Sequence, residues 1–382
     1  MFDNGRFLFY NLHIYFYSVK TIFKEKGYTA RVEPCPCAKR KAMKNKSLKK
    51  HSTFKRVVCA ALAVLLIYVA GSVVTSMVVF HYVFKRTEYP RTYEISYGDI
   101  EKTLYPRETV RFTSGENTLV GYLYKKENAP GTIIIVNGVF SGADRHLAEI
   151  MYFLDNGWQV FSFDGTGVGD STGNTIVGLQ QTKLDLLAAI KSLKKTYTFS
   201  TPFMLYGHSA GGYAAISVLG SIKDIAAAVS IAGFNSPVGT MHFHARQRVG
   251  FLADIEYPFL WLQNRILFGQ DADIKALDVL DSTDTPVMII EGSEDSVVPD
   301  DIGIGRYSSD FKNPNAKFYN IDTPYRNSHT TIWLSSAAAK RVSDAAKANT
   351  DTAVPLSERL EMNEVDTAFL DGILDFYKTA VE

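Results

Sequence analysis

Eight short runs rich in β-branched and aromatic residues constrain the fold of this chain more than any other feature of its sequence. Several of them, such as TIIIV at 132–136 and VMII at 287–290, form nearly continuous apolar runs. Continuous apolar strands are typical of a parallel sheet that is covered on both faces. The predicted strands are residues 109–112, 119–124, 132–136, 159–164, 203–206, 226–231, 287–291 and 316–321.

Segments with helical periodicity alternate with these runs. The predicted helices are residues 143–156, 175–195, 211–219, 333–348 and 363–380. Strand and helix in alternation predict an α/β domain with a mostly parallel, eight-stranded sheet flanked by helices. A ligand of such a sheet binds beyond the carboxyl ends of its strands.

The alternation lapses between Phe234 and Pro286, in a stretch that includes Phe243, Phe251 and Trp261. A connection of roughly 50 residues is long for a bare loop. We therefore expect a helical insertion at about 235–285 that covers the site as a lid. The alternative is an extra packing helix without a lid role.

A different signal precedes the sheet, because residues 57–80 form a run of 24 residues without a charge. At about 1.5 Å of rise per residue, a helix of this length crosses a hydrocarbon core of roughly 30 Å. We predict one transmembrane helix here rather than a buried core helix. A cleaved signal peptide, with its cleavage site near Ala70-Gly71-Ser72, is the main alternative.

The charge distribution predicts the orientation of this helix. Residues 1–87 hold 16 of the 41 Lys and Arg but only 3 of the 40 Asp and Glu. Most of these cations precede the helix, so we expect its amino end in the cytoplasm. The predicted organisation is a single-pass protein of the cell membrane, with a basic cytoplasmic segment (1–56), the helix (57–80), a connector (81–108) and an extracytoplasmic domain (109–382). The acidic excess of that domain argues against a nucleic-acid partner.

The residues before the helix carry weaker signals. All three cysteines, Cys35, Cys37 and Cys59, precede the helix or lie within it, which suits an exported domain without thiols. An aromatic cluster at 7–17 is too short to span a membrane. Met43 opens a compact basic region directly before the helix, and we hypothesise that it is the physiological start, which would leave residues 1–42 outside the mature protein.

The motif that carries chemistry follows the predicted strand at 203–206. It reads Gly207-His208-Ser209-Ala210-Gly211, and a helical pattern follows it. This is G-x-S-x-G in the strand, turn and helix context of a nucleophile elbow. The glycines let strand and helix approach without Cβ clashes, and the helix amino terminus directs N–H groups at developing negative charge. Ser209 is therefore the candidate nucleophile.

With this motif and those around it, residues from about 109 to 382 resemble the α/β-hydrolase superfamily, especially its members similar to monoglyceride lipase and serine aminopeptidase. The resemblance implies a triad in the order Ser, acid, His. It implies Asp295 as the acid, in the segment GSEDSVVP that matches the family's G-x-x-D-x-x-V-P turn, with Glu294 and Glu291 as rivals. It implies His329, after the last strand, as the base.

The roles of the triad follow from the weakness of a serine hydroxyl as a nucleophile. His329 would take the proton of Ser209 during attack and give it to the leaving group, while Asp295 would hold the imidazole in the required tautomer.

An oxyanion hole needs two N–H donors. One would come from the backbone of Ala210. By the resemblance, the other would come from Val139, with Phe140 as the fallback, in a loop where Asn137 stands at the family's usual histidine position.

Two further patterns are interpreted as structural. Residues 164–171 (DGTGVGDS) resemble the family's D-x-R-G-x-G-x-S, with Thr166 at the usual arginine position, and we interpret them as a loop supported by Asp164 rather than a dinucleotide site. His242 and His244 are interpreted as a surface pair rather than zinc ligands. We expect no cofactor and no metal.

These patterns predict a membrane-anchored serine hydrolase that cleaves a carboxylic ester, small or lipid-like, through an acyl-enzyme intermediate. A serine aminopeptidase is the alternative among enzymes, with Asp254 and Glu256 available to hold a free amine. A catalytically silent binding module with the same fold is the alternative outside enzymes.

Overall fold

The computed structural model describes residues 39–88, 93–197, 201–348 and 354–382, with side chains from Thr53 onward. The chain divides into two compact units, residues 1–68 and 69–382, and the sheet lies in the second. The aromatic cluster at 7–17 and the pair Cys35 and Cys37 lie outside the described residues.

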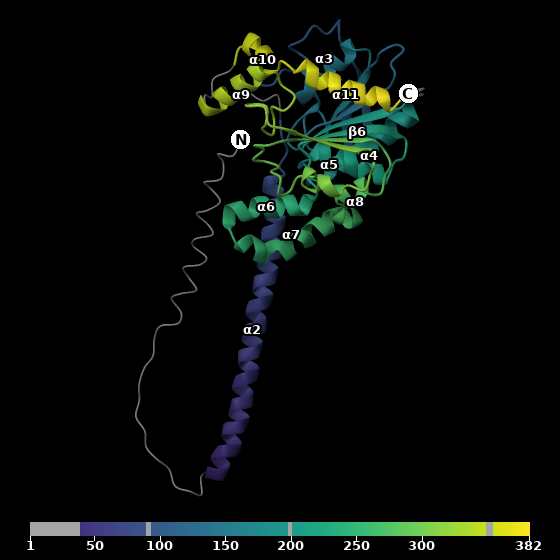
Figure 1. The fold of residues 1–382 in the computed structure, drawn as a ribbon. Helices are drawn as coiled ribbons and strands as arrows, with labels where there is room; N and C mark the ends of the chain where they lie inside the picture. Colours follow the sequence, from purple (N-terminus) through teal and green to yellow (C-terminus); the bar gives the residue numbers. More distant parts are fainter. Residues whose placement is uncertain (1–38, 89–92, 198–200, 349–353) are drawn as a thin grey trace. The chain divides into compact units, whose positions relative to one another are not determined.

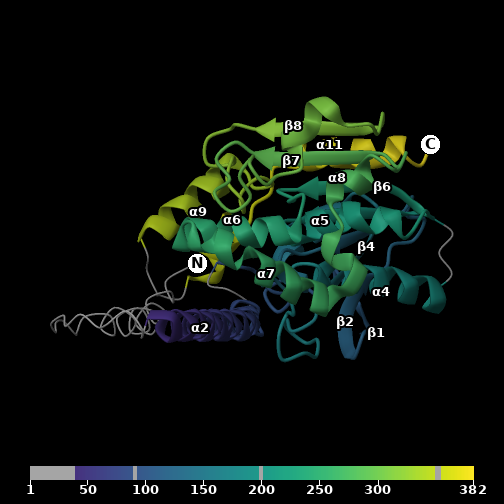
Figure 2. The same cartoon turned by 90° about the horizontal axis from the view of Figure 1, so that it is seen from below.

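All eight predicted strands are confirmed, and they form one sheet in the order β1-β2-β4-β3-β5-β6-β7-β8. β2 runs antiparallel to both of its neighbours, and the other neighbouring pairs are parallel. Figure 2 shows the sheet from β8 at one edge to β1 and β2 at the other. The strands are β1 (Glu108–Ser114), β2 (Asn117–Tyr124), β3 (Thr132–Val136), β4 (Gln159–Asp164), β5 (Phe203–His208), β6 (Ile225–Ile231), β7 (Val287–Gly292) and β8 (Ala316–Ile321).

The central strands β3 and β5 are buried at every position because their two faces enter different cores. In β3, Ile134 and Val136 belong to one apolar cluster, while Ile133 and Ile135 belong to the other. The first cluster includes residues of α4 (Gln181–Thr196), α5 (Ala210–Ser217) and α8 (Ala276–Leu280); the second includes residues of α3 (Leu147–Asp155), α9 (Ser336–Ala348) and α11 (Thr367–Thr379). Figure 1 shows α3 and α11 on one side of the sheet, with α4, α5 and α8 on the other. Since strand side chains alternate between faces, such a run requires a helical layer on each side.

Several helix boundaries differ from the prediction. α4 begins at Gln181 rather than at 175, because Val177 adopts a φ of 68°, outside the range of a right-handed helix. The helix predicted from Trp333 begins only at Ser336. A short helix, α10 (Leu356–Met362), was not predicted.

The stretch between β6 and β7 is helical, as expected. It contains α6 (Pro237–Val249), α7 (Leu252–Phe268), the 3-10 turn η5 (Gly269–Asp273) and α8. Ser236 caps α6 by accepting the N–H of Gly239 at 3.3 Å, with Pro237 at the first helical position, where its missing N–H costs nothing. Gly250 ends α6 with a φ of 61° and Gly269 ends α7 with a φ of 56°, a conformation that glycine adopts without strain.

The predicted apolar helix is part of α2 (Lys39–Val83). Within the described part of the chain, Thr53–Val83 is the one helix segment long and apolar enough to cross a membrane, by length and composition. The last turns of α2 belong to the second unit, where Ser72, Phe80 and the following Phe84 are buried against the α/β body.

The segment after α2, predicted as a connector, is held tightly by the body. The guanidinium of Arg86 donates to the backbone carbonyls of Ser171 at 2.8 Å, Gly173 at 3.1 Å and Gly169. The N–H of Thr87 also donates to the carbonyl of Gly167 at 3.0 Å. The end of the apolar helix is therefore fixed to the glycine-rich loop that follows β4.

Candidate active site

The chain turns sharply between β5 and α5, and Ser209 occupies the turn. Its φ of 57° and ψ of −117° are strained for a residue with a side chain. A Cβ on Gly207 would lie 2.1 Å from the carbonyl oxygen of Gly211, and one on Gly211 would lie 1.9 Å from that of Val136. Only glycine fits at either position, so both glycines of the motif are required by the close approach of strand and helix.

Asp295 and His329 are brought together from the ends of neighbouring parallel strands, β7 and β8. Asp295 Oδ2 lies 2.7 Å from His329 Nδ1. The second oxygen of Asp295 accepts the N–H groups of Val297 and Val298, each at 2.8 Å. Because an ionised carboxylate only accepts, Nδ1 of His329 carries the proton and Nε2 is left as the basic nitrogen.

The two rival carboxylates have other surroundings. Glu291 is buried and accepts the N–H of Gly305 at 2.8 Å, and burial raises its pKa to about 7. Glu294 is exposed. Of the three candidate acids, Asp295 is the one that hydrogen-bonds His329.

His208, beside Ser209 in the sequence, connects the elbow to the loop of His329. Its Nε2 lies 2.8 Å from the backbone carbonyl of His329, and the two rings are 4.9 Å apart. A carbonyl only accepts, so Nε2 of His208 carries a proton. Burial holds the pKa of His208 well below its usual value, so its imidazole is neutral. The motif alone gives His208 no role, although its position beside Ser209 is a local signal that it lies at the elbow.

The loop after β3 lies against the elbow. A Cβ on Gly138 would be 3.2 Å from Cβ of Ser209. The N–H of Ser141 donates to the carbonyl of Gly138 at 3.2 Å, which closes a turn with Val139 and Phe140 at its centre. Phe140 adopts a φ of 67°, a position that favours glycine.

The two expected oxyanion donors lie in this loop and at the start of α5. α5 begins at Ala210, whose N–H is among the first of a helix and has no carbonyl one turn earlier to bind. Val139 is half-buried in the loop beside Ser209. Asn137, at the family's usual histidine position, is buried and its Nδ2 donates to the carbonyl of Phe163 at 3.4 Å.

The loop at 164–171 has the contacts of a structural element. Asp164 accepts the N–H of Ala143 at 2.7 Å and that of Asp170 at 2.9 Å, and so joins this loop to the one after β3. Thr166 donates its N–H and its hydroxyl to Asp185, at 2.7 and 3.0 Å. The Asp185 carboxyl is fully buried, and this burial raises its pKa.

The two histidines of the insertion are half-buried rather than fully exposed. His242 Nε2 lies 2.9 Å from Asp254 Oδ1. His244 hydrogen-bonds the backbone of Val297, two residues after Asp295, so α6 reaches the loop that carries the candidate acid. Among the described residues, no group of three or more His, Cys, Asp or Glu is placed to hold a metal ion.

An eight-stranded, mostly parallel sheet with a serine elbow after β5 is the α/β-hydrolase fold, and this chain has that fold. Residues 127–266 match the family model described as serine aminopeptidase, S33.

Curated relatives are distant. Uncharacterized protein YqkD of Bacillus subtilis is 26% identical over 183 residues, which cover 47% of this chain and 60% of that protein. Human protein ABHD12B is 25% identical over 178 residues, which cover 42% of this chain and 44% of that protein. The chain therefore covers less than two thirds of either relative.

Solved structures share the fold. The esterase Pf2001 of Pyrococcus furiosus superposes with a TM-score of 0.53 in one crystal form and 0.52 in another, at 19% identity. Each match covers 78% of this chain and 99 to 100% of the esterase.

Proposed function

We propose that this α/β-hydrolase is a membrane-anchored serine hydrolase that cleaves a carboxylic ester through an acyl-enzyme intermediate. The observation that carries the proposal is the 2.7 Å contact of Asp295 with His329, whose loop is bound in turn to the residue before Ser209. Esterase activity in a protein of the same fold is consistent with it.

The geometry suggests how each residue would act. Nε2 of His329, left basic by the contact of Nδ1 with Asp295, would accept the proton of Ser209 as its oxygen attacks the ester carbonyl. The N–H groups of Ala210 and Val139 would stabilise the oxyanion. The protonated imidazole would then protonate the departing alcohol, which leaves the acyl group on Ser209. Water would next attack this acyl group while His329 takes its proton, and His329 would return a proton to Ser209 as the acid departs.

An ester is favoured over a peptide by the acidic residues of the insertion. A peptidase that holds a free amine needs an available carboxylate. Asp254 binds His242 at 2.9 Å and lies 3.8 Å from Arg246, while Glu256 accepts the hydroxyl of Ser72 at 3.1 Å. Both carboxylates are engaged elsewhere. The purified full-length protein should hydrolyse a short-chain p-nitrophenyl ester and leave aminoacyl p-nitroanilides intact; the opposite preference would assign it to peptidases.

The alternative of a silent binding module is tested by the same assay. A silent module would give no turnover on either substrate class. Turnover that disappears in Ser209→Ala, with unchanged thermal unfolding, would exclude it.

The anchor and its orientation are part of the proposal. Thr53–Val83 provides a helix of sufficient length, and the basic residues ahead of it favour an amino end in the cytoplasm. Protease added to intact cells should then degrade the domain at 109–382. Protection of that domain until the membrane is permeabilised would reverse the orientation, and a soluble product that begins near Val73 would identify a cleaved signal.

A further inference from the structure

Helix α7 carries a stripe of exposed apolar side chains on one face. Phe251, at its amino-terminal cap, is 69% exposed, Ile255 48%, Leu262 39% and Ile266 66%. These four residues, here called the α7 stripe, are spaced by four, seven and four, so they follow one side of a helix. A helix at the surface of a globular protein normally presents polar residues on its outer side. The stripe therefore indicates a contact with something apolar.

None of the three charged residues of α7 belongs to the α7 stripe, and each is paired with a neighbour. Asp254 pairs with His242, Glu256 accepts the hydroxyl of Ser72, and Arg265 pairs with Asp273. The charges of α7 are thus bound within the protein.

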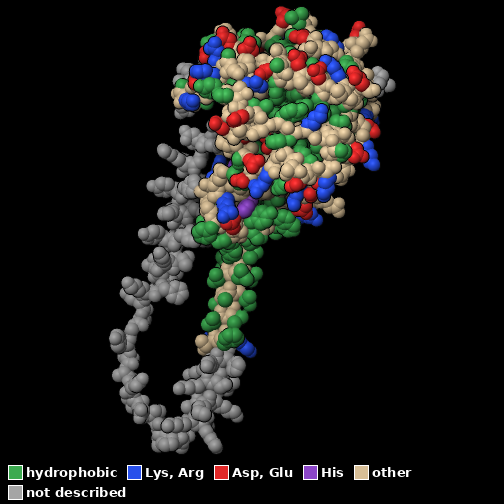
Figure 3. Space-filling model, in the orientation of Figure 1, with side chains coloured by type: hydrophobic (Ala, Val, Ile, Leu, Met, Phe, Trp, Pro, Cys, Tyr) green, Lys and Arg blue, Asp and Glu red, His purple; other side chains and the backbone are tan. Residues whose placement is uncertain are grey.

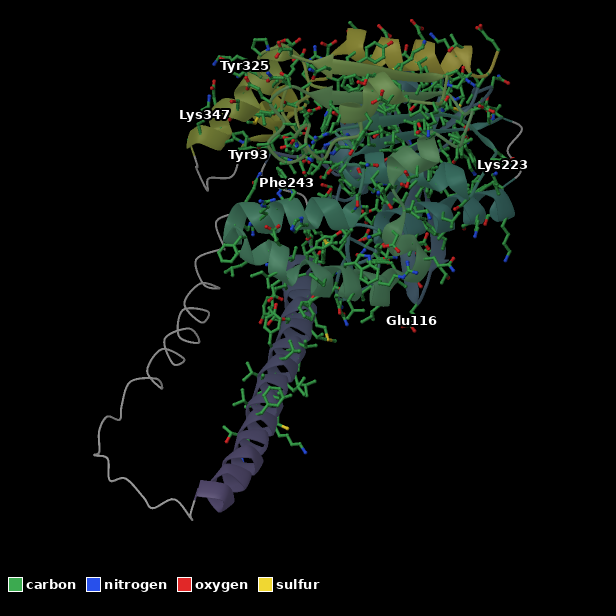
Figure 4. The ribbon with its side chains drawn as sticks, turned by 60° about the horizontal axis from the view of Figure 1, so that its bottom comes forward. Tyr93, Glu116, Lys223, Phe243, Tyr325 and Lys347 are labelled. Carbon is green, nitrogen blue, oxygen red and sulfur yellow. The ribbon has the colours of Figure 1, made fainter. Side chains whose placement is uncertain are left out.

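The end of the apolar helix α2 lies along α7. Ser72 Oγ donates to Glu256 Oε1 at 3.1 Å, and Ser76 Oγ donates to the carbonyl of Phe259 at 3.2 Å. On the sides of α2 that face away from α7, Val74 is 59% exposed and Met77 53%. Figure 3 shows apolar side chains gathered where α2 meets the insertion, and Figure 4 shows the side chains of this region, with Phe243 marking α6.

In the proposed anchor, the length of the uncharged run places this contact at a membrane boundary. A spanning helix needs about 20 apolar residues. The uncharged run begins at Val57, directly after Lys55 and Arg56, so about 20 residues end near Ser76. Ser72 and Ser76, both bonded to α7, therefore fall in the last turns of the span. This result depends on counting residues and holds for either orientation of the helix.

We propose that α7 lies in the interfacial layer of the lipid bilayer, with the α7 stripe against the acyl chains. A contact surface of this kind places the insertion at the membrane surface. If the proposed function also holds, an ester substrate dissolved in the bilayer reaches the site from the membrane rather than from water.

Fluorescence quenching by lipid tests the contact. In the full-length protein, Cys35, Cys37 and Cys59 are replaced by serine, and a single cysteine is introduced as Phe251→Cys or Ile266→Cys and labelled with the environment-sensitive dye NBD. The matched control is Tyr319→Cys on β8, where the native side chain is 46% exposed. Each protein is reconstituted into phosphatidylcholine vesicles, with and without phosphatidylcholine spin-labelled near the head of its acyl chain.

The proposal predicts blue-shifted emission and quenching by the spin label at positions 251 and 266, and neither effect at position 319. Emission at 251 and 266 that matches position 319 would overturn it. A blue shift lost in nanodiscs that hold a single copy would assign the stripe to contacts between copies, and would also overturn it.

A second measurement separates this proposal from the proposed function. Phe251→Glu and Ile266→Glu should reduce hydrolysis of a long-chain fluorogenic ester dissolved in the vesicles while a short-chain ester in water is cleaved as before. Equal loss on both esters would contradict entry from the membrane. If the native protein cleaves neither ester, the proposed function has failed, and the quenching result still decides whether α7 contacts the bilayer.

Discussion

The ring of Phe84 stacks on the ring of Phe140, with centroids 6.4 Å apart and planes inclined by 16°. Phe84 directly follows α2, and Phe140 lies in the loop expected to form the oxyanion hole. A bulky residue at positive φ costs roughly 1–3 kcal/mol and persists only where its surroundings fix it. Phe84 is 3% exposed and supplies part of that support. The residue that directly follows the apolar helix is therefore in contact with the candidate site.

Replacing Phe84 with leucine removes the stacking but keeps an apolar side chain. The turn at Val139 and Phe140 should relax, and kcat for ester hydrolysis should fall on the order of 10- to 10²-fold with little change in KM, because the oxyanion acts on the transition state. The matched control is Phe112→Leu, a buried phenylalanine of the same core whose ring contacts Phe161 and Phe163 instead. Equal kcat in the two variants would show that Phe84 contributes only to packing.

His208 should be a positioning residue for His329. Its Nε2–H holds the backbone of His329 at 2.8 Å, so His208→Leu should lower kcat by about 10²-fold through displacement of the base. His208→Gln keeps an N–H donor and should recover part of the loss. Tyr206→Phe is the control, since the Tyr206 hydroxyl is buried without a hydrogen-bond partner among the described residues. Full activity in His208→Leu would remove the positioning role.

Asp295→Asn tests whether Asp295, rather than the neighbouring Glu294, is the acid of the triad. The remaining oxygen can still accept the N–H groups of Val297 and Val298, so the amide nitrogen would face His329 and impose the wrong tautomer. Turnover should fall by a factor on the order of 10⁴ without loss of folding. Glu294→Gln, at an exposed position, should have no such effect. A large loss in Glu294→Gln with little change in Asp295→Asn would move the acid by one residue.

Glu291 should make stability depend on pH. Its pKa rises from 4.5 to about 7 on folding, mainly because of burial, so the folded protein binds this proton more tightly than the unfolded chain. The stabilisation is complete below about pH 4.5 and is lost as the pH rises to about 7, a difference of about 3 kcal/mol. In Glu291→Gln, the free energy of unfolding, measured with urea, should no longer show this decrease between about pH 4.5 and 7. The same pH dependence of the free energy of unfolding in the variant and the native protein would show that the Glu291 carboxyl is not protonated in the folded state.

The strands and the serine turn could be predicted because their signals are local. The run of four apolar residues in β3 and the glycines at 207 and 211 indicate the sheet and the elbow without knowledge of any distant partner. The start of α4 could not be predicted in this way. The N–H of Ile176 donates to the carbonyl of Phe84, a residue about 90 positions away, and the next residue, Val177, leaves the helical region with a φ of 68°.

The contacts around the site depend on tertiary structure. The contact between His208 and His329 joins residues 121 positions apart. The docking of α2 against the body is indicated in the sequence by four residues that recur every four positions and so share one helix face: Ser72, Ser76, Phe80 and Phe84. A uniformly apolar run masks this pattern, because hydropathy alone does not distinguish a lipid-facing side from a protein-facing one.

Labelling with a fluorophosphonate tests the central claim most directly, because this reagent reacts with a serine only when a base and an oxyanion hole activate it. The full-length protein and its Ser209→Ala variant are compared in isolated membranes, and the modified peptide is identified by mass spectrometry. The account predicts stoichiometric labelling of Ser209 in the native protein and none in Ser209→Ala, with equal amounts of folded protein. Absence of labelling in the folded native protein, or equal labelling of the variant, would contradict it.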